Sequence, residues 1–330
     1  MEMESTSIKD VALRARLSVS TVSRVLNRRG YISKETYDKV YKAIEELDYH
    51  PNQLARSLYR KRTDIIGLVI PDVSHPFFAM LTKYIEYRLC SEGFRMMLCN
   101  TIERQNRERD YLDMLRQNKV DGIIIGSHLL EVKDYERVNL PIVSIDMVLG
   151  DNIPVVSADH RKGGILAAQK LIDGGCTHLL QIIGNMKVNT PSHLRHSTFA
   201  DYARQRNVDC ITYELESHEF DVMRYSEIID HLLSTYPNID GVFAVDVIAA
   251  RVVQCARHRG ISIPGRLKVV GYDGTDIASL MSPRLTTVAQ PFRELSDTIV
   301  TTLEQIIKGE EAIPHIQLLD VSMQEGETTM

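Results

Sequence analysis

The chain has 330 residues, of which 44% are hydrophobic and 25% charged, which is typical of a globular protein with two or three domains. No apolar run approaches the length of a membrane span and the N-terminus is polar and acidic, which argues against a membrane protein and predicts a cytoplasmic location. The five cysteines lie far apart without a CxxC pair, which favours reduced structural thiols over a metal site.

Charge is unevenly distributed along the chain. Residues 1–62 contain thirteen Lys and Arg against eight Asp and Glu, a net charge of +5. The remainder contains 26 basic against 36 acidic residues, a net charge of −10. A basic head on an acidic body predicts that a polyanion binds the head and not the body.

The first 50 residues have the pattern of three short helices. Ser7-Ile-Lys-Asp10 is a capping box that opens a helix through Ala15. Ser18 caps a second helix over Val19–Leu26, and Ser33 caps a third that runs to about Leu47. Two short helices joined by a tight turn and followed by a third form the helix-turn-helix plan. We therefore predict a helix-turn-helix DNA-binding domain over residues 1–50.

Candidate DNA contacts follow from this plan, in which the start of the second helix meets base edges in the major groove. Val19 and Ser20 lie at that start, and Arg24, one turn later, can reach a guanine. Hydroxyl groups on a small basic unit are suited to phosphate contacts, although a Ser or Thr at a helix start is more often only a cap. These hydroxyls belong to Ser7, Ser18, Thr21, Ser23, Ser33 and Thr36.

Residues 51–62 form a basic segment between the head and the body. Leu54 and Leu58 lie four residues apart, on one face of a short predicted helix that begins at Pro51. An isolated helix of about ten residues is marginal in water, so its order should depend on a partner. An apolar side chain among arginines suits an element that kinks DNA from the minor groove. A charged interdomain linker is the alternative.

Residues 63–330 alternate between short apolar runs and helical stretches. This alternation predicts an α/β body of doubly wound parallel sheets with helices on both faces. Helices are predicted at about 77–93 and 107–118. The predicted strands are Ile65–Ile70, Arg95–Leu98, Gly122–Ile125, Ile142–Ile145, Leu179–Ile183, Gly241–Ala244 and Lys268–Val270.

Polar residues follow the predicted strands, where parallel sheets bind their ligands. Carboxylates and amides accept hydrogen bonds from vicinal hydroxyls and an arginine donates, so this set suits a sugar. At each position the alternative to ligand binding is an Asp at a strand end that only caps a helix. The candidates in or near these segments are Asp72, Asp146, Asp246, Asp273 and Gln290.

Three motifs together resemble the LacI family of bacterial transcription regulators: Ile8-Lys-Asp-Val-Ala12, Val19-Ser-Thr-Val-Ser-Arg-Val-Leu-Asn27 and Tyr49-His-Pro-Asn-Gln-Leu-Ala-Arg-Ser-Leu58. The resemblance implies a hinge helix over residues 52–60, with Leu58 inserting into the operator's central step, and makes Val19 and Ser20 the specificity positions. The same motifs add further DNA-contacting positions at Asn27, Tyr49, Asn52 and Ala55. Arg16 departs from relatives that often carry Gly or Asn in the turn, and a positive φ there would cost about 1 kcal/mol.

The body resembles the periplasmic-binding-protein-like core of the family, in which two subdomains close on an effector. The resemblance implies an N-subdomain of about 63–161 and 291–320 and a C-subdomain of about 162–290. Asp246 departs from several relatives that have Asn, which removes a hydrogen-bond donor. The positions that match the family's effector contacts are Phe77, Phe78, Asp146, Arg195, Asp246, Asp273 and Gln290.

Four stretches look closest to repressors of sucrose operons: Ser127–Leu130, Ile153–Asp159, Val270–Thr275 and Leu285–Pro291. We therefore predict a homodimeric repressor of a sugar operon, released from a palindromic operator by sucrose, fructose or a phosphorylated form. The alternative is a catabolite-control-type regulator whose DNA binding is strengthened by a phosphorylated carrier protein. No GxSxG, HExxH or Gly-rich phosphate loop is present, so we predict no enzyme, and also no cofactor and no metal.

Two smaller expectations concern packing. Leu81, Tyr84, Ile85 and Leu89 form an apolar stripe that is expected to supply part of a dimer face, although such a stripe is more often core. The pair Gly163-Gly164 is expected to lie in a turn or at a helix end.

Overall fold

The computed structural model describes residues 6–26, 30–49, 62–101, 104–127, 129–184, 191–215 and 222–330. The chain forms two compact units, Met1–Thr63 and Asp64–Met330, which are taken separately below. Residues 51–61, which include the predicted hinge helix and Leu58, lie outside the described residues.

The first unit is a small three-helix domain, as predicted. Its helices are α1 (Ile8–Ala15), α2 (Val19–Leu26) and α3 (Lys34–Glu46). The capping box is present, because the backbone N–H of Ser7 donates to Oδ2 of Asp10 at 2.8 Å. The helices pack around Val11, Val22, Val25 and Val40, which are fully buried.

The turn between α1 and α2 carries the backbone feature expected at Arg16. This residue is the C-cap of α1 and has φ +55°, in the left-handed region. A side chain with a Cβ is strained there, because Cβ approaches the following carbonyl oxygen. The helix-turn-helix geometry of this unit therefore includes a local cost.

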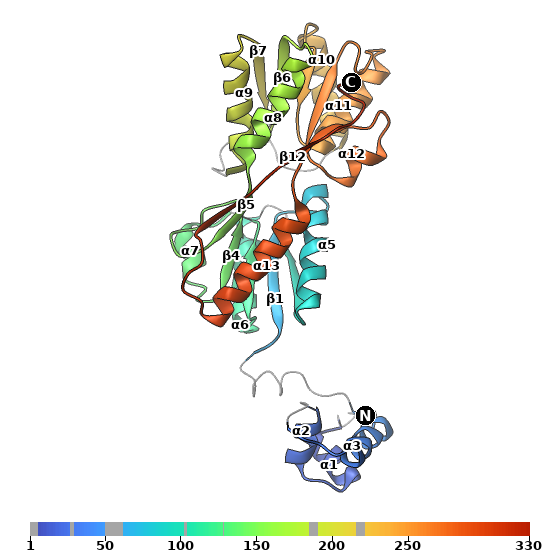
Figure 1. Ribbon diagram of the computed structural model, residues 1–330, viewed down its shortest axis with the longest axis vertical. Coiled ribbons are helices and arrows are strands. Elements are labelled where there is room, and N and C mark those ends of the chain that lie inside the picture. The colour runs from blue at the N-terminus through green and yellow to red at the C-terminus, as the bar shows by residue number, and fades with distance from the viewer. Residues whose placement is uncertain are drawn as a thin grey trace. The chain divides into compact units, whose positions relative to one another are not determined.

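The second unit contains two sheets, and the first of them is wholly parallel (Figure 1). Its strand order is β11-β5-β4-β3-β1-β2. Helices α5 and α13 cover one face and α6 and α7 the other, because alternate residues of each strand point to opposite faces. The elements are β1 (Ile65–Ile70), α5 (Pro76–Ser91), β2 (Arg95–Asn100), α6 (Gln105–Gln117), β3 (Gly122–Ile125), α7 (Val132–Glu136), β4 (Ile142–Ile145), β5 (Val155–Ala158), α13 (Phe292–Lys308) and β11 (Ile316–Leu319).

The second sheet has the order β12-β10-β9-β8-β6-β7, with only β12 antiparallel to its neighbour. Helices α8 and α9 cover one face, and α10 and α11 the other. The elements are α8 (His160–Asp173), β6 (His178–Ile183), η1 (Pro191–His193), α9 (Leu194–Gln205), β7 (Asp209–Glu214), α10 (Val222–Thr235), β8 (Gly241–Phe243), α11 (Asp246–His258), β9 (Lys268–Asp273), α12 (Asp276–Leu280), β10 (Thr286–Ala289) and β12 (Ser322–Gln324).

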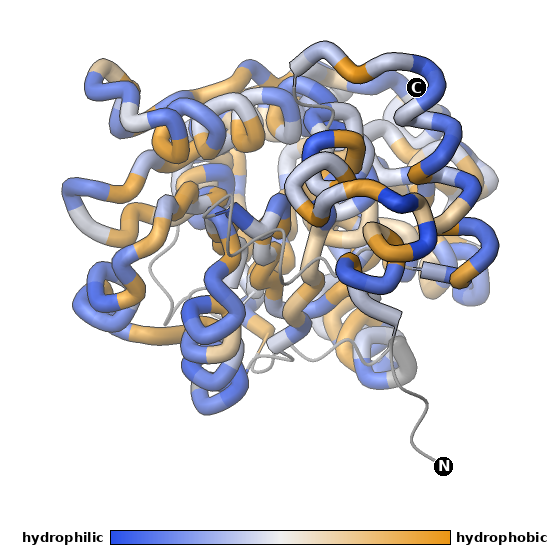
Figure 2. The backbone as a smooth tube through the Cα atoms, turned by 90° about the horizontal axis from the view of Figure 1, so that it is seen from below, coloured by the Kyte–Doolittle hydropathy of each residue, from blue (hydrophilic) through white to orange (hydrophobic). Residues whose placement is uncertain are grey.

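Strands β1–β5 of the first sheet and β6–β10 of the second are arranged in the same order, so the body contains two doubly wound α/β halves, as predicted. The chain passes between the sheets at Asp159, at Gln290–Pro291 and at Asp320–Val321. Along the helices the colour alternates between hydrophilic and hydrophobic residues, as expected for elements with one buried face (Figure 2).

Several local expectations were wrong. Leu81, Ile85 and Leu89 of α5 are at most 1% exposed and pack in the core of the first sheet against α13, so they do not form an exposed face; only Tyr84 of the expected stripe is partly exposed. Gly163 and Gly164 lie inside α8, not in a turn. Strand β9 runs on to Asp273, so this residue ends the strand and does not follow it.

Candidate effector site and DNA-binding surface

Asp146 directly follows β4 and is the centre of a hydrogen-bonded group at the first crossover. Its φ of +60° lies in the left-handed region. Ser157 donates its hydroxyl to Oδ1 of Asp146 at 2.7 Å, and His160 Nε2 lies 3.0 Å from the same oxygen. The other ring nitrogen of His160, Nδ1, lies 2.8 Å from the hydroxyl of Tyr272. One chain of contacts therefore links β4, the start of α8 and β9.

Arg195, near the start of α9, is held at two points. Its guanidinium lies over the ring of Tyr272, 4.5 Å from the centroid, and its Nε donates to Nε2 of His196 at 3.2 Å. His196 is buried, and its Nδ1 lies 3.2 Å from Oε1 of Gln181. Burial, followed by the charge of Arg195, lowers the pKa of His196 well below its usual value. A neutral imidazole thus supports the arginine without repelling it.

Asp273 and Gln290 form a second buried pair, where β9 and β10 end. The side-chain amide of Gln290 donates to Oδ1 of Asp273 at 2.8 Å. The amide oxygen of Gln290 is buried and finds no hydrogen-bond partner among the described residues. Asp273 also has a positive φ, +112°. A positive φ and an unpaired buried acceptor meet at this one pair, which makes it a candidate ligand site.

Asp246, at the start of α11, behaves differently from the other candidates. It is 1% exposed. Its Oδ2 accepts from the backbone N–H of Thr275 at 2.6 Å and from the Thr275 hydroxyl at 2.8 Å. Its Oδ1 accepts from the Thr287 hydroxyl at 2.6 Å. These bonds fix the turn that carries Asp273, so the geometry gives Asp246 a supporting role.

The loop after β1 supplies the remaining candidates. Asp72 accepts from the backbone N–H and hydroxyl of Ser74, at 2.9 and 2.8 Å, and so closes a tight turn. Phe77 is buried against Phe292 in the core of the first sheet, whereas Phe78 is partly exposed. Of the two aromatic residues, Phe78 is therefore the one whose ring can meet a ligand.

Electrostatic effects tie the first loop, β4 and β9 together. Burial raises the pKa of Asp273 to about 7, with Arg195 opposing this and Asp246 adding to it. Burial raises the pKa of Asp246 to about 6. Burial, followed by the charge of Arg195, lowers the pKa of His75 in the first loop to about 4. Burial would also raise the pKa of Asp146, but His160, Ser157 and Arg195 together lower it. Arg195 thus acts on groups from both sheets.

The contacts of Ser157, His160 and Tyr272 were not foreseen from the sequence. Ser157 lies within β5, a strand that was not predicted, and His160 lies two residues after its end. A strand assignment over Val155–Ala158 would have placed both residues at the carboxyl end of the sheet. Tyr272 gave no separate signal, since it reads as one more apolar strand residue.

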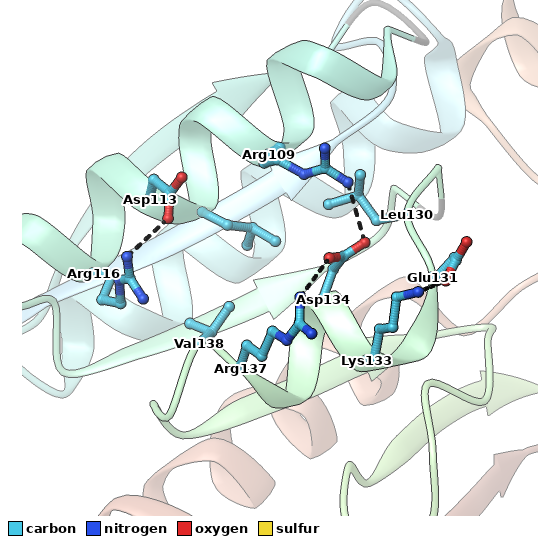
Figure 3. A pocket seen from close by; sticks show the side chains of 10 residues that line it. Arg109, Asp113, Arg116, Leu130, Glu131, Lys133, Asp134, Arg137 and Val138 are labelled. Carbon is cyan, nitrogen blue, oxygen red and sulfur yellow. Dashed lines mark hydrogen bonds and ion pairs between the residues drawn. The ribbon is translucent and has the colours of Figure 1, made fainter.

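A pocket lies between α6 and α7 of the first sheet (Figure 3). It has a volume of about 470 Å³. Its cationic side chains pair with carboxylates: Arg109 and Arg137 with Asp134, Arg116 with Asp113 and Lys133 with Glu131. This pairing leaves no concentrated positive charge for an anionic partner. Among the described residues no cluster of His, Cys, Asp or Glu could hold a metal, and no helix is long and apolar enough to cross a membrane.

In the helical head, the start of α2 presents the side chains expected to read DNA. Val19 is 42% exposed, and Ser20 and Arg24 are also exposed. Ser18 caps α2 by accepting from the backbone N–H of Thr21 at 3.1 Å. Ser33 likewise accepts from the N–H of Thr36 at 3.3 Å, so these hydroxyls act as caps and remain at the surface.

The other residues predicted to contact DNA differ in how far their side chains are exposed. Ser7 caps α1 and its side chain is exposed, and Ser23 lies part-buried on α2. Tyr49 is only 7% exposed and packs in the core of the head, so its ring supports the fold. Asn27, Asn52, Ala55 and Leu58 lie outside the described residues.

Comparison with known proteins agrees with both units. Residues 7–52 match the family described as "Bacterial regulatory proteins, lacI family", and residues 168–329 match the periplasmic binding protein-like domain. The ribose operon repressor of Halalkalibacterium halodurans is 41% identical over 88% of this chain and 87% of its own length. The sucrose operon repressor of Streptococcus mutans is 39% identical over 97% of this chain and 98% of its own.

Solved structures show the same architecture. The Lac repressor dimer bound to operator and the anti-inducer ONPF is 26% identical, with a TM-score of 0.86 over 99% of this chain and 100% of that one. A periplasmic binding protein/LacI transcriptional regulator from Alkaliphilus metalliredigens, complexed with D-xylulofuranose, is 32% identical. It has a TM-score of 0.76 over 81% of this chain and 99% of that one.

Fold and comparisons lead to one assignment. The chain has a helix-turn-helix head and two doubly wound sheets joined by three crossovers, and relatives of about 40% identity match nearly its whole length. A bacterial transcription regulator acts in the cytoplasm, which agrees with the expectation from the sequence. The chain belongs to the lacI family of bacterial regulatory proteins, as a DNA-binding repressor with a sugar-binding type of core and not as an enzyme.

Proposed function

We propose that this protein represses a sugar-utilisation operon as a dimer on a palindromic operator, and that a neutral sugar bound between the two sheets of the core releases it. The observation that carries the proposal is the group formed by Asp146, Arg195, Asp273 and Gln290. It combines carboxylate acceptors, a fixed guanidinium donor and a buried amide oxygen that finds no partner among the described residues. Vicinal hydroxyls of a sugar both donate and accept, and so complement this set.

The charge of the site favours a neutral sugar over a sugar phosphate. The charge of Arg195 acts on Asp146 and Asp273, and burial already raises the pKa values of Asp273 and of the neighbouring Asp246. A phosphate would add about 1.5 to 2 negative charges beside them. Coulomb repulsion in a partly buried site would then oppose binding.

Sucrose and ribose are the first effectors to test. Relatives at similar identity are named for ribose and for sucrose operons, and one similar structure holds the furanose sugar D-xylulofuranose. The stretches Ser127–Leu130 and Leu285–Pro291 favour sucrose. We therefore propose sucrose as the effector, with ribose as the competing assignment.

The mechanism that we propose is a two-state linkage. In the effector-free dimer the segments that contain Leu58 insert into the operator, and sugar binding favours an arrangement in which they separate. A sugar can shift this equilibrium only if it binds the two states with different affinity. Coupling of about 1–3 kcal/mol is typical of such systems and would lower operator affinity roughly 5- to 150-fold.

The test is fluorescence anisotropy of the full chain on its own promoter DNA at fixed salt, because phosphate contacts make binding steeply salt-dependent. Sucrose, ribose, fructose, their phosphates and a phosphorylated carrier protein are titrated separately. Release by a neutral sugar but not by its phosphate is the expected result. If the carrier protein tightens binding while every sugar is inert, the proposal is wrong and the catabolite-control alternative holds.

The Leu58 assignment has its own test. Leu58→Ala should weaken binding to the operator and leave binding to unrelated DNA unchanged, because the wedge acts only where the DNA is kinked. Leu54→Ala is the matched control, since it removes the same volume one turn earlier. Equal operator affinity of the Leu58 variant and the wild type would show that Leu58 is not the wedge.

A further inference from the structure

We infer that His160 is a positioning residue, which fixes the Asp146 carboxylate for the effector and couples it to Tyr272 and Arg195 on the other sheet. This inference rests on the proposed binding of a sugar between the sheets. His160 does not belong to the set that the family resemblance marked as effector contacts. Its position is what assigns the role: it opens α8 immediately after the crossover at Asp159.

The contacts of His160 determine its tautomer. Oδ1 of Asp146 lies 3.0 Å from Nε2, and a carboxylate with a lowered pKa only accepts hydrogen bonds, so Nε2 carries the proton. In a neutral imidazole Nδ1 then accepts, and the hydroxyl of Tyr272 donates to it over 2.8 Å. The chain of donors runs in one direction, from Tyr272 through His160 to Asp146.

This chain leaves part of the Asp146 carboxylate for another donor. Among the described residues, the hydrogen bonds of Asp146 from Ser157 and His160 both end on Oδ1. The carboxylate is therefore oriented through one oxygen, while Oδ2 can accept from a sugar hydroxyl. Holding an acceptor in place before binding reduces the entropy lost when the ligand arrives.

The hydrogen bonds from Tyr272 through His160 to Asp146 also join the two sheets. Asp146 belongs to the first sheet, whereas Tyr272 lies in β9 of the second and carries the guanidinium of Arg195 over its ring. His160 and Tyr272 are 2% and 0% exposed, so water does not compete for their contact. Gly163, one turn after His160, leaves room for Tyr272: a Cβ there would lie 2.7 Å from the tyrosine hydroxyl. The close approach of α8 to β9 is thus part of the arrangement.

Two substitutions at position 160 separate the contacts of His160. His160→Gln keeps an N–H donor near the position of Nε2 and so retains the bond to Asp146. His160→Asn places its amide near the position of Nδ1, so that it can keep the Tyr272 contact and loses the bond to Asp146. Tyr272→Phe removes only the hydroxyl and keeps the ring under Arg195.

The first measurement is calorimetric titration of the full-length variants with sucrose and ribose. Affinity for the sugar that binds the wild type should fall about tenfold in His160→Asn and remain within about threefold of the wild type in His160→Gln. If His160 had only a structural role, the sugar affinity of each variant would fall in step with its thermal stability. Wild-type affinity in both variants would overturn the inference about His160. If the wild-type protein binds neither sugar, the effector assignment is wrong, and the second measurement then decides whether His160 has the proposed contacts.

The second measurement needs no sugar. Nitrogen NMR of the wild type should show the Nε2 of His160 protonated. Tyr272→Phe should shift the Nδ1 resonance because its donor is gone, and Tyr202→Phe on α9 is the control that should not. A proton on Nδ1, or an unchanged Nδ1 resonance in Tyr272→Phe, would show that the chain from Tyr272 to Asp146 does not exist.

Discussion

The side-chain amide of Gln290 donates a 2.8 Å hydrogen bond to Asp273, while the oxygen of the same amide is buried without a partner in the described part of the chain. The bond fixes which way the amide points, since its nitrogen must face the carboxylate. The oxygen is then held ready for a donor. A buried acceptor left unpaired costs about 1–3 kcal/mol, and a ligand hydroxyl recovers this.

Asp273→Asn should raise the sugar concentration needed for release about 10- to 150-fold and leave operator affinity within about twofold of the wild type. The change replaces a charged acceptor by an amide, which loses about 1.5–3 kcal/mol for hydrogen bonds to a charged group. Anisotropy titrations with and without sugar measure both quantities. Asp276→Asn, an exposed acid three residues later, is the matched control. Normal release in Asp273→Asn would remove this residue from the effector site.

Sugar affinity should rise with pH between about 6 and 8. Burial raises the pKa of Asp273 to about 7, so the carboxyl becomes an ionised, stronger acceptor across this range. The gain has a ceiling of roughly tenfold, since about one carboxyl in ten is already ionised one unit below the pKa. Calorimetric titrations at pH 6, 7 and 8 measure it. Asp273→Asn should remove the dependence, and a slope that persists there would assign the effect to Asp246 or another neighbour.

The same shift predicts how stability depends on pH. A carboxyl whose pKa is raised in the folded state binds more protons when folded than when unfolded. Its contribution to stability is therefore complete below about pH 4 and is lost as the pH rises through about 7. The unfolding temperature of the sugar-free protein should decline over this window, and less steeply in Asp273→Asn. An identical decline in both proteins would contradict the assignment.

Asp246→Ala should destabilise the core by about 2–3 kcal/mol, because it leaves the buried groups of Thr275 and Thr287 without their acceptor. Urea unfolding followed by far-ultraviolet circular dichroism measures this loss. Asp276→Ala, at the exposed start of α12, should change stability by less than about 0.5 kcal/mol. If Asp246→Ala unfolds like the wild type but no longer binds sugar, Asp246 is an effector contact and not a support.

Arg16→Gly should stabilise the head by about 0.5–1 kcal/mol, because glycine adopts the observed φ of +55° without strain. Arg14→Gly should have the opposite effect, since it places glycine inside α1 and removes the ion pair with Glu46. Hydrogen exchange of the buried amides of Val11 and Val22 reports on this domain within the full chain. If Arg16→Gly gives the same protection as the wild type, the turn stores no strain.

The sequence by itself determined the elements of this protein. The capping box at Ser7, the serines that cap α2 and α3, and the alternation of apolar runs with helical stretches are local patterns, set by backbone hydrogen bonding and side-chain periodicity within a few residues. They were enough for a helix-turn-helix head and doubly wound sheets. Short edge strands such as β11 and β12 were not predicted, because their residues have little apolar periodicity.

Only the tertiary structure decided which polar residues meet, and in which role. In the sequence Asp246 and Asp273 are both carboxylates at a strand end. In the structure Asp246 accepts hydrogen bonds from threonines, whereas Asp273 accepts from the amide of Gln290, whose oxygen has no partner among the described residues. His160 and Tyr272 are 112 residues apart and meet because the chain crosses between the sheets at Asp159. Leu81, Ile85 and Leu89 are core and not interface because α13, more than 200 residues later in the sequence, returns to cover them. Such contacts depend on chain topology, which periodicity over a few residues does not encode.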